Sequence, residues 1–173
     1  MSDLATDHKI NAELKALEWP PRWRLWVYVS SQVLDEQQMK SMKEAFTQFQ
    51  AQWSAHGKAL RSDMALVQDQ ILLIAVDEDH AKTTGCSLDK LTHFIGQVEL
   101  ELKTDFLDRS KFYVYDRENE VWRSFNRVRL KQAYQVGEVN DETLVLDTLI
   151  DSAGKVKTEL VKPLASSWHS KIV

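Results

Sequence analysis

Residues able to carry out chemistry gather in one stretch of the sequence, Asp77–Ser87, which reads DEDHAKTTGCS. This stretch holds the single cysteine of the chain, Cys86, between Gly85 and Ser87. If a helix begins here, its free backbone N–H groups and the positive end of its dipole lower the pKa of the thiol and favour the reactive thiolate. The stretch therefore makes Cys86 a candidate nucleophile.

A nucleophilic cysteine needs a base and a group that orients the base. His56 and His169 are distant from Cys86 in the sequence, and either could reach it in the folded chain. Asp77 is the candidate for orienting that histidine. No known signature of a catalytic cysteine surrounds Cys86, and a lone cysteine is more often a small buried hydrophobic residue. Catalysis requires an exposed Cys86 with a histidine nitrogen close to its sulfur.

The same helix start could instead bind a small anion without covalent chemistry. Backbone N–H groups at Gly85 and Ser87 would contact the anion. The acidic run Asp77-Glu78-Asp79 would repel it unless these carboxylates point away or hold a metal. Their spacing matches no calcium loop, so we expect no metal site and interpret the run more simply as a solvated loop.

Cofactor and nucleic-acid signatures are absent from the sequence. His56-Gly57-Lys58 would need a glycine at position 52 to form a phosphate-binding loop, and Gln52 stands there. The formal net charge is −4, whereas nucleic-acid binding usually needs an extended basic surface. The densest basic stretch comprises Arg123, Arg127, Arg129 and Lys131. We therefore expect no cofactor and no nucleic acid, which leaves a protein or a small anion as the partner.

Length and composition describe a globular protein. The chain has 173 residues, of which 43% are hydrophobic and 28% charged. No window approaches the ~18–20 apolar residues needed to cross a bilayer, and the N-terminus lacks the apolar run of a secretory signal. A single cysteine excludes an internal disulfide. These features predict a cytoplasmic protein that does not insert into membranes.

Two amphipathic helices and one buried strand dominate the hydrophobic pattern. Asp35 and Gln38 predict a capping box at the start of the first helix, which His56-Gly57 would end. Ser87 would be the N-cap of the second helix or lie in its first turn. Between the helices, Ile71–Val76 (ILLIAV) is continuously apolar, which is typical of a central strand with both faces covered.

The remaining segments complete an α+β pattern. Strands are expected at residues 25–30, 60–66, 112–116 and 121–125, a third short helix at 126–135, and a closing C-terminal hairpin formed by 143–150 and 156–161. Strand, helix, strand, strand, helix, strand is the order of a ferredoxin-like split βαβ core. In that core two helices cover one face of an antiparallel sheet.

Residues 1–19 are expected to form an N-terminal helical arm that precedes a single α+β domain at residues 20–173. Ile10, Leu14 and Leu17 recur at helical spacing, and Pro20-Pro21 must end any helix. The arm could pack on its own domain or on a second copy, and the second arrangement would make a homodimer.

Four short motifs stand out as a set: Gln52–Gly57, Ala75–Glu78, Gly85–Asp89 and Ser167–Ser170. Together they resemble a family of small uncharacterised bacterial proteins often labelled "ABC transporter ATPase", over residues 20–173. No P-loop ATPase activity is expected, because the chain lacks a Walker A motif. The resemblance implies that the shared-pattern residues converge on one site; they are His56, Asp77, Glu78, Cys86, Ser87, Asp89, Trp168 and His169. It thereby adds Glu78, Asp89 and Trp168 as candidate ligand-binding residues.

The sequence as a whole favours a non-catalytic cytoplasmic binding or interaction domain, because no cofactor fingerprint, metal spacing or catalytic signature is present. This hypothesis predicts that His56, Cys86 and His169 lie apart or pack in ordinary contacts. The alternative is a small enzyme or an anion-binding site at residues 77–89, which would use Cys86 with one of the two histidines.

Overall fold

The computed structural model describes the backbone of residues 2–173 and the side chains from His8 onward. The helices are α1 (Ser2–Lys15), α2 (Glu36–Gln52), α3 (Gly85–Leu102), α4 (Arg127–Gln135) and α5 (Val156–Glu159). The strands are β1 (Arg24–Val29), β2 (Ser54–Ala55), β3 (Lys58–Ala59), β4 (Ser62–Val67), β5 (Ile71–Val76), β6 (Phe112–Asp116), β7 (Val121–Phe125), β8 (Leu144–Leu146) and β9 (Val161–Pro163). Short 3₁₀ turns are η1 (Ala153–Lys155), η2 (Leu164–Ser166) and η3 (Trp168–Lys171). The α+β class predicted from the sequence is confirmed.

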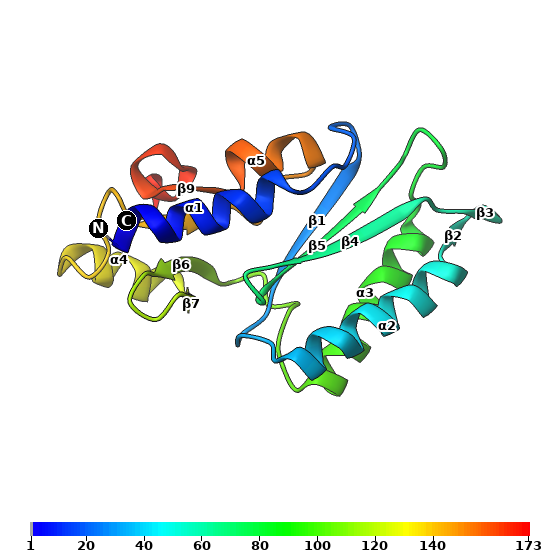
Figure 1. Cartoon of the computed structure of the whole chain (residues 1–173), viewed down its shortest axis with the longest axis horizontal. Helices are drawn as coiled ribbons and strands as arrows, with labels where there is room; N and C mark the ends of the chain where they lie inside the picture. Colours follow the sequence, from blue (N-terminus) through cyan, green and yellow to red (C-terminus); the bar gives the residue numbers. More distant parts are fainter. Residues whose placement is uncertain (1) are drawn as a thin grey trace.

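The first sheet contains three strands in the order β1-β5-β4, and both strand pairs are antiparallel. Helices α2 and α3 lie side by side on one face of this sheet (Figure 1). All six residues of β5 are buried, as its uninterrupted apolar sequence predicted. The sheet therefore forms the scaffold on which the two long helices are positioned.

The predicted ferredoxin-like sheet is formed only in part, because its fourth strand is missing. Strand β6 was expected at the free edge of β1, but it belongs to a second sheet in the order β7-β6-β8-β9. An irregular segment takes its place along β1. The Arg109 guanidinium donates to the carbonyl of Val27 at 2.9 Å, and the Ser31 N–H donates to the carbonyl of Asp105 at 3.0 Å.

Three hydrophobic clusters join these elements into layers. One lies between the first sheet and the α2–α3 pair, and it includes Met42, Phe46, Leu72, Ile74 and Phe94. Another lies between the two sheets and α1, and a third lies between the second sheet and α4.

None of the helices in the described residues combines the length and the apolar character needed to cross a bilayer.

Helix α1 packs on its own chain. Ile10 and Leu14 are buried in the cluster between the two sheets, and the carboxylate of Glu13 accepts a hydrogen bond of 2.8 Å from the backbone N–H of Gln68. In the structure the N-terminal arm therefore packs on its own domain, which is one of the two arrangements that the sequence left open.

The predicted C-terminal hairpin is wrong in its second strand. Strand β8 covers only Leu144–Leu146 and pairs with β9, whereas the intervening residues form η1 and α5. Backbone N–H groups of Ala153 and Gly154 donate to the carbonyls of Trp23 and Pro21, both at 2.8 Å. Val156 and Leu160 are buried one helical turn apart, so the apolar spacing that suggested a strand fits a helical turn instead.

The observed helix ends agree with those predicted from the sequence, except for the end of α2. Asp35 and Gln38 form the predicted capping box of α2, and Thr84 with Ser87 forms a second one at α3. Helix α2 ends at Gln52, earlier than expected. His56 (φ 50°) and Gly57 (φ 75°) instead form the two-residue turn between β2 and β3, where a positive φ at both positions is the favoured geometry.

Candidate functional site

The acidic run after β5 is held by internal contacts. Asp77 is buried, accepts a hydrogen bond from the N–H of Asp79 at 3.2 Å and lies 3.4 Å from the Arg61 guanidinium. Glu78 pairs with Arg24 at 3.2 Å. Burial alone would raise the pKa of Glu78, but hydrogen bonds from Thr83 and Arg24 lower it below its usual value. These carboxylates therefore stabilise the loop.

The candidate cysteine and histidines lie in three separate segments of the fold. Cys86 is exposed in the first turn of α3, next to Gly85, and His56 is exposed in the β2–β3 turn. His169 lies in the C-terminal segment, at the opposite end of the molecule from the start of α3 (Figure 1). Across residues 8–173, no hydrogen bond joins Cys86 to a histidine or to Asp77.

The C-terminal motif is part of the packing of the second sheet. His169 is 1% exposed, stacks on Trp168 with 4.0 Å between ring centroids, and shares a 2.7 Å hydrogen bond between its Nδ1 and the Ser167 hydroxyl. Phe112 of β6 meets both rings edge-on. Burial lowers the pKa of His169, and the negative charge of Asp147 opposes that shift.

The buried His169 makes stability depend on pH. Burial gives this imidazole a lower pKa in the folded chain than in the unfolded chain, where the pKa is about 6.5, so the unfolded chain takes up the proton first as the pH falls. We expect the free energy of unfolding to fall as the pH drops below that value, by at most about 1.4 kcal/mol per pH unit for one proton. Urea unfolding of His169→Asn should show a flatter pH dependence, and the exposed His56→Asn serves as control. Equal slopes in the two variants would contradict a role for His169.

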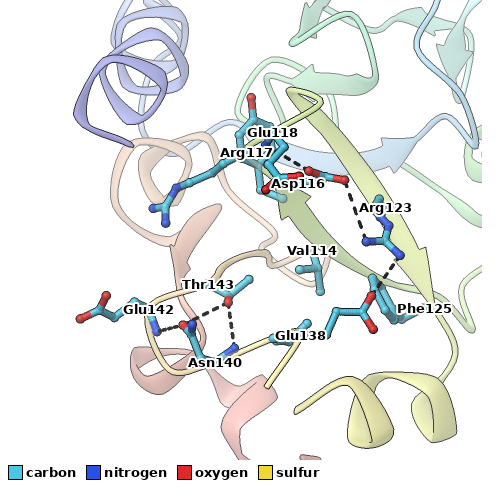
Figure 2. Close-up of a pocket in the computed structure, with 12 residues that line it drawn as sticks. Val114, Asp116, Arg117, Glu118, Arg123, Phe125, Glu138, Asn140, Glu142 and Thr143 are labelled. Atoms are coloured by element: carbon cyan, nitrogen blue, oxygen red, sulfur yellow. Dashed lines mark hydrogen bonds and ion pairs between the residues drawn. The ribbon is translucent and has the colours of Figure 1, made fainter. Parts of the chain in front are cut away.

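One cavity, of about 480 Å³, lies between the β6–β7 hairpin and the loop at residues 137–143 (Figure 2). Several of its charged side chains are paired with one another. Arg123 contacts Glu138 at 3.1 Å and Asp116 at 3.9 Å, and Arg129 also contacts Glu138. A hydrogen bond from Arg129 lowers the pKa of Glu138, and one from Asn119 lowers that of Asp116. An ion-pair network therefore forms part of the lining of this cavity, whereas the carboxylates of Glu118 and Glu142 form no ion pair among the described residues.

A second cavity differs in chemistry. The interhelical groove, about 420 Å³, lies between the C-terminal half of α2 and the N-terminal half of α3. Its floor consists of Phe49, Trp53 and Phe94. Phe49 stacks on Phe94 with centroids 4.4 Å apart and planes at 12°, and it lies 4.9 Å from Trp53. The groove continues into a neighbouring cavity of about 320 Å³ that shares four of its lining residues.

Polar side chains surround the aromatic floor. They are Gln52, Asp89, Lys90, His93 and Gln97. In the part of the chain that the structure describes, none of the five forms a side-chain hydrogen bond or ion pair. All five are exposed. Their donors and acceptors are therefore available to a bound molecule, in contrast to those of Arg123 and Glu138 in the cavity beside the β6–β7 hairpin.

A buried hydrogen bond beneath the aromatic floor joins the two helices that form the groove. The indole N–H of Trp53, the C-cap of α2, donates to the backbone carbonyl of Ser87 in the first turn of α3 at 2.9 Å. Trp53 is 1% exposed and Ser87 is fully buried. This bond ties the end of α2 to the start of α3. Ser87 therefore has a structural role at the groove, through its carbonyl and its capping hydroxyl.

Of the residues expected to bind a ligand, the structure places Asp89 alone in the groove lining. Met42, Phe46, Phe49 and Trp53 recur at helical spacing in the sequence, a pattern that is typical of an ordinary core stripe. A usable signal is the change along that stripe: after Met42 every apolar position is aromatic, and Phe49 and Trp53 are flanked by glutamines. Comparisons with protein-family models, with curated proteins and with solved structures found no match to this chain.

Proposed function

We propose that the protein is a non-catalytic cytoplasmic binding domain that accepts an apolar, aromatic-bearing segment of a protein partner in the interhelical groove. The observation that carries this proposal is the stacked Phe49–Phe94 pair at the floor of an open cavity, whose polar rim has no side-chain partners among the residues that the structure describes. A mainly apolar pocket with a few converging polar groups is the usual form of a binding site.

The shape of the groove favours a polypeptide over a compact small molecule. Its two cavities follow α3 from Asp89 to Glu101, and twelve residues of helix correspond to a length of about 18 Å. A groove of that length between two helices suits side chains spaced along a peptide, as in the binding of an amphipathic helix. The Gln48, Gln52 and Gln97 amides along its sides offer hydrogen bonds without charge.

The proposal agrees with the absence of a nucleophile–base pair around Cys86 in the described residues. Among the described residues the exposed thiol forms no hydrogen bond to a histidine, and His169 is buried in the C-terminal segment. Binding energy at the groove would come from covering the aromatic rings, at roughly 25 cal/mol per Å² of apolar surface removed from water. No group needs to change its protonation state.

The groove can be tested with an aromatic probe, 1-anilinonaphthalene-8-sulfonate, in two-dimensional NMR of the native protein. The chain has six tryptophans and therefore six indole N–H signals. We expect the Trp53 signal and backbone amides of α2 and α3 to shift, while the other five indole signals stay in place. Shifts centred on another surface, or no saturable binding, would reject the groove as the site.

A substitution with a matched control makes the same test quantitative. Gln97→Glu places a carboxylate beside the aromatic floor, where it repels the sulfonate of the probe, and we expect it to weaken probe binding by about tenfold, equivalent to about 1.4 kcal/mol. Gln132→Glu makes the same change at an exposed position of α4 and should leave the dissociation constant unchanged. Equal affinities of the two variants would contradict the proposal.

A further inference from the structure

One edge of the first sheet is open. In an antiparallel ladder, alternate residues of a strand bond to the same neighbour. The N–H of Asp77 donates to the carbonyl of Arg61 at 2.9 Å, so in β4 the main-chain groups of Asp63 and Ala65 face β5. Those of Ser62, Met64 and Leu66 face away. The opposite edge, along β1, is covered by the irregular segment that contains Asp105 and Arg109.

Both ends of the β4 edge are blocked by side chains. The Gln50 amide donates to the carbonyl of Ser62, and the Glu13 carboxylate accepts from the N–H of Gln68. Between them, the N–H of Met64 donates to the Asp63 carboxylate at 2.8 Å. Among the described residues, no group bonds to the carbonyl of Met64 or to the main chain of Leu66. The open part of the edge is thus Met64–Leu66.

The sequence around this opening is complementary to itself. Suppose that a second β4 lies antiparallel to the first, about a twofold axis at Ala65. The residue numbers of each facing pair then add up to 130. Met64 then faces Leu66 of the other copy, and Ser62 faces Gln68. Arg61 of each copy faces Asp69 of the other copy, so two pairs of opposite charges form across the axis. Arg61 and Asp69 are both exposed, and Asp69 has no ion-pair partner within the described residues.

We propose that a second copy of this chain docks on the open edge of β4, through antiparallel β4–β4 pairing centred on Ala65. The register places the outward-facing Met64 and Leu66 in hydrogen-bonded pairs, so each exchanges N–H and carbonyl bonds with its counterpart. The N–H of Met64 leaves the Asp63 carboxylate for the carbonyl of Leu66 in the other copy. The two three-stranded sheets become one continuous sheet.

The flanks of the opening supply apolar contacts. Met64 and Leu66 are half-buried on the face covered by α2, and Leu17 and Trp19 are half-buried on the opposite face. The indole N–H of Trp19 donates to Asp63 at 2.6 Å, which fixes the ring near the edge. An exposed strand edge with apolar side chains is the usual starting point for strand addition. The dimer surface is separate from the interhelical groove, so the two proposals do not depend on each other.

Amide hydrogen exchange across a concentration series, read together with sedimentation velocity, tests this dimer on the unmodified protein. We expect the mass to rise from 20.0 kDa toward twice that value as concentration increases. In parallel, the N–H of Leu66 should become protected. The N–H of Ala65, which faces β5, should be protected at every concentration. A monomer throughout, or a dimer in which Leu66 stays unprotected, would overturn the proposal.

Charge reversal tests the register. Arg61→Asp and Asp69→Arg each place like charges across the axis, and we expect each to raise the dimer dissociation constant about tenfold. The double variant restores opposite charges and should recover most of the affinity. Thermal unfolding of each variant verifies that the fold is retained, since Arg61 also contacts Asp77. Failure of the double variant to recover affinity would reject this register.

Discussion

Replacing Gln70 by methionine should lower the free energy of unfolding by about 4 kcal/mol, because three buried hydrogen bonds are lost at once. The Gln70 side chain is 2% exposed and lies where the two sheets meet. Its amide nitrogen donates to the carbonyls of Ser30 and Trp122, at 3.0 and 2.8 Å, and its oxygen accepts from the N–H of Trp122 at 2.9 Å. Methionine fills a similar volume but pairs with none of these groups.

The buried position explains the size of this effect. Ser30 directly follows β1 and Trp122 belongs to β7, so the Gln70 side chain bonds to backbone groups next to the first sheet and within the second. Each orphaned buried backbone group costs about 1–3 kcal/mol. The same substitution at Gln50 is the control, since Gln50 is half-buried and bonds to Ser62 alone; there we expect a loss of about 1 kcal/mol. Urea unfolding of both variants measures the difference, and equal losses would contradict a joining role for Gln70.

Trp53→Ala should destabilise the protein by about 4 kcal/mol and abolish binding at the interhelical groove. The substitution removes a large, fully packed aromatic ring, for which typical losses are about 3–5 kcal/mol. It also leaves the carbonyl of Ser87 without its indole donor. Because Phe49 lies 4.9 Å from the Trp53 ring, the floor of the groove loses its support.

Trp53→Phe separates the two contributions. Phenylalanine retains most of the ring packing but cannot donate to Ser87, so we expect a smaller loss of about 2 kcal/mol. Probe binding at the groove should be retained in this variant and lost in Trp53→Ala. Urea unfolding and probe titration on the same samples give both values. If Trp53→Ala still binds the probe with native affinity, the groove floor does not depend on Trp53.

Local sequence was sufficient wherever the decisive contacts lie within a few residues. The capping box of Asp35 and Gln38 was predicted correctly, because both partners are three residues apart. The burial of Ile71–Val76 was also predictable, since an uninterrupted apolar strand is stable only with both faces covered. Ser87 was placed correctly in the first turn of α3, although the N-cap is Thr84.

The candidate site could not be predicted in the same way. The start of α3, which carries Cys86, and the C-terminal segment, which carries His169, lie at opposite ends of the molecule (Figure 1), and only the fold determines that separation. The aromatic floor depends on the distance between α2 and α3, which leaves the ring of Phe49 partly accessible instead of fully covered. Amphipathic spacing shows which residues face inward, but it does not show whether the helices close over them.

The amino-acid sequence by itself determined the elements with strong local signals: α2, α3, β5 and the class of the protein. Tertiary structure alone decided which strands share a sheet. Strand β6 is a plausible partner for β1 by pattern, yet Arg109 and Asp105 occupy that edge and β6 pairs with β7 and β8. Strand pairing depends on contacts between residues far apart in the chain, and alternating hydrophobicity does not specify the partner.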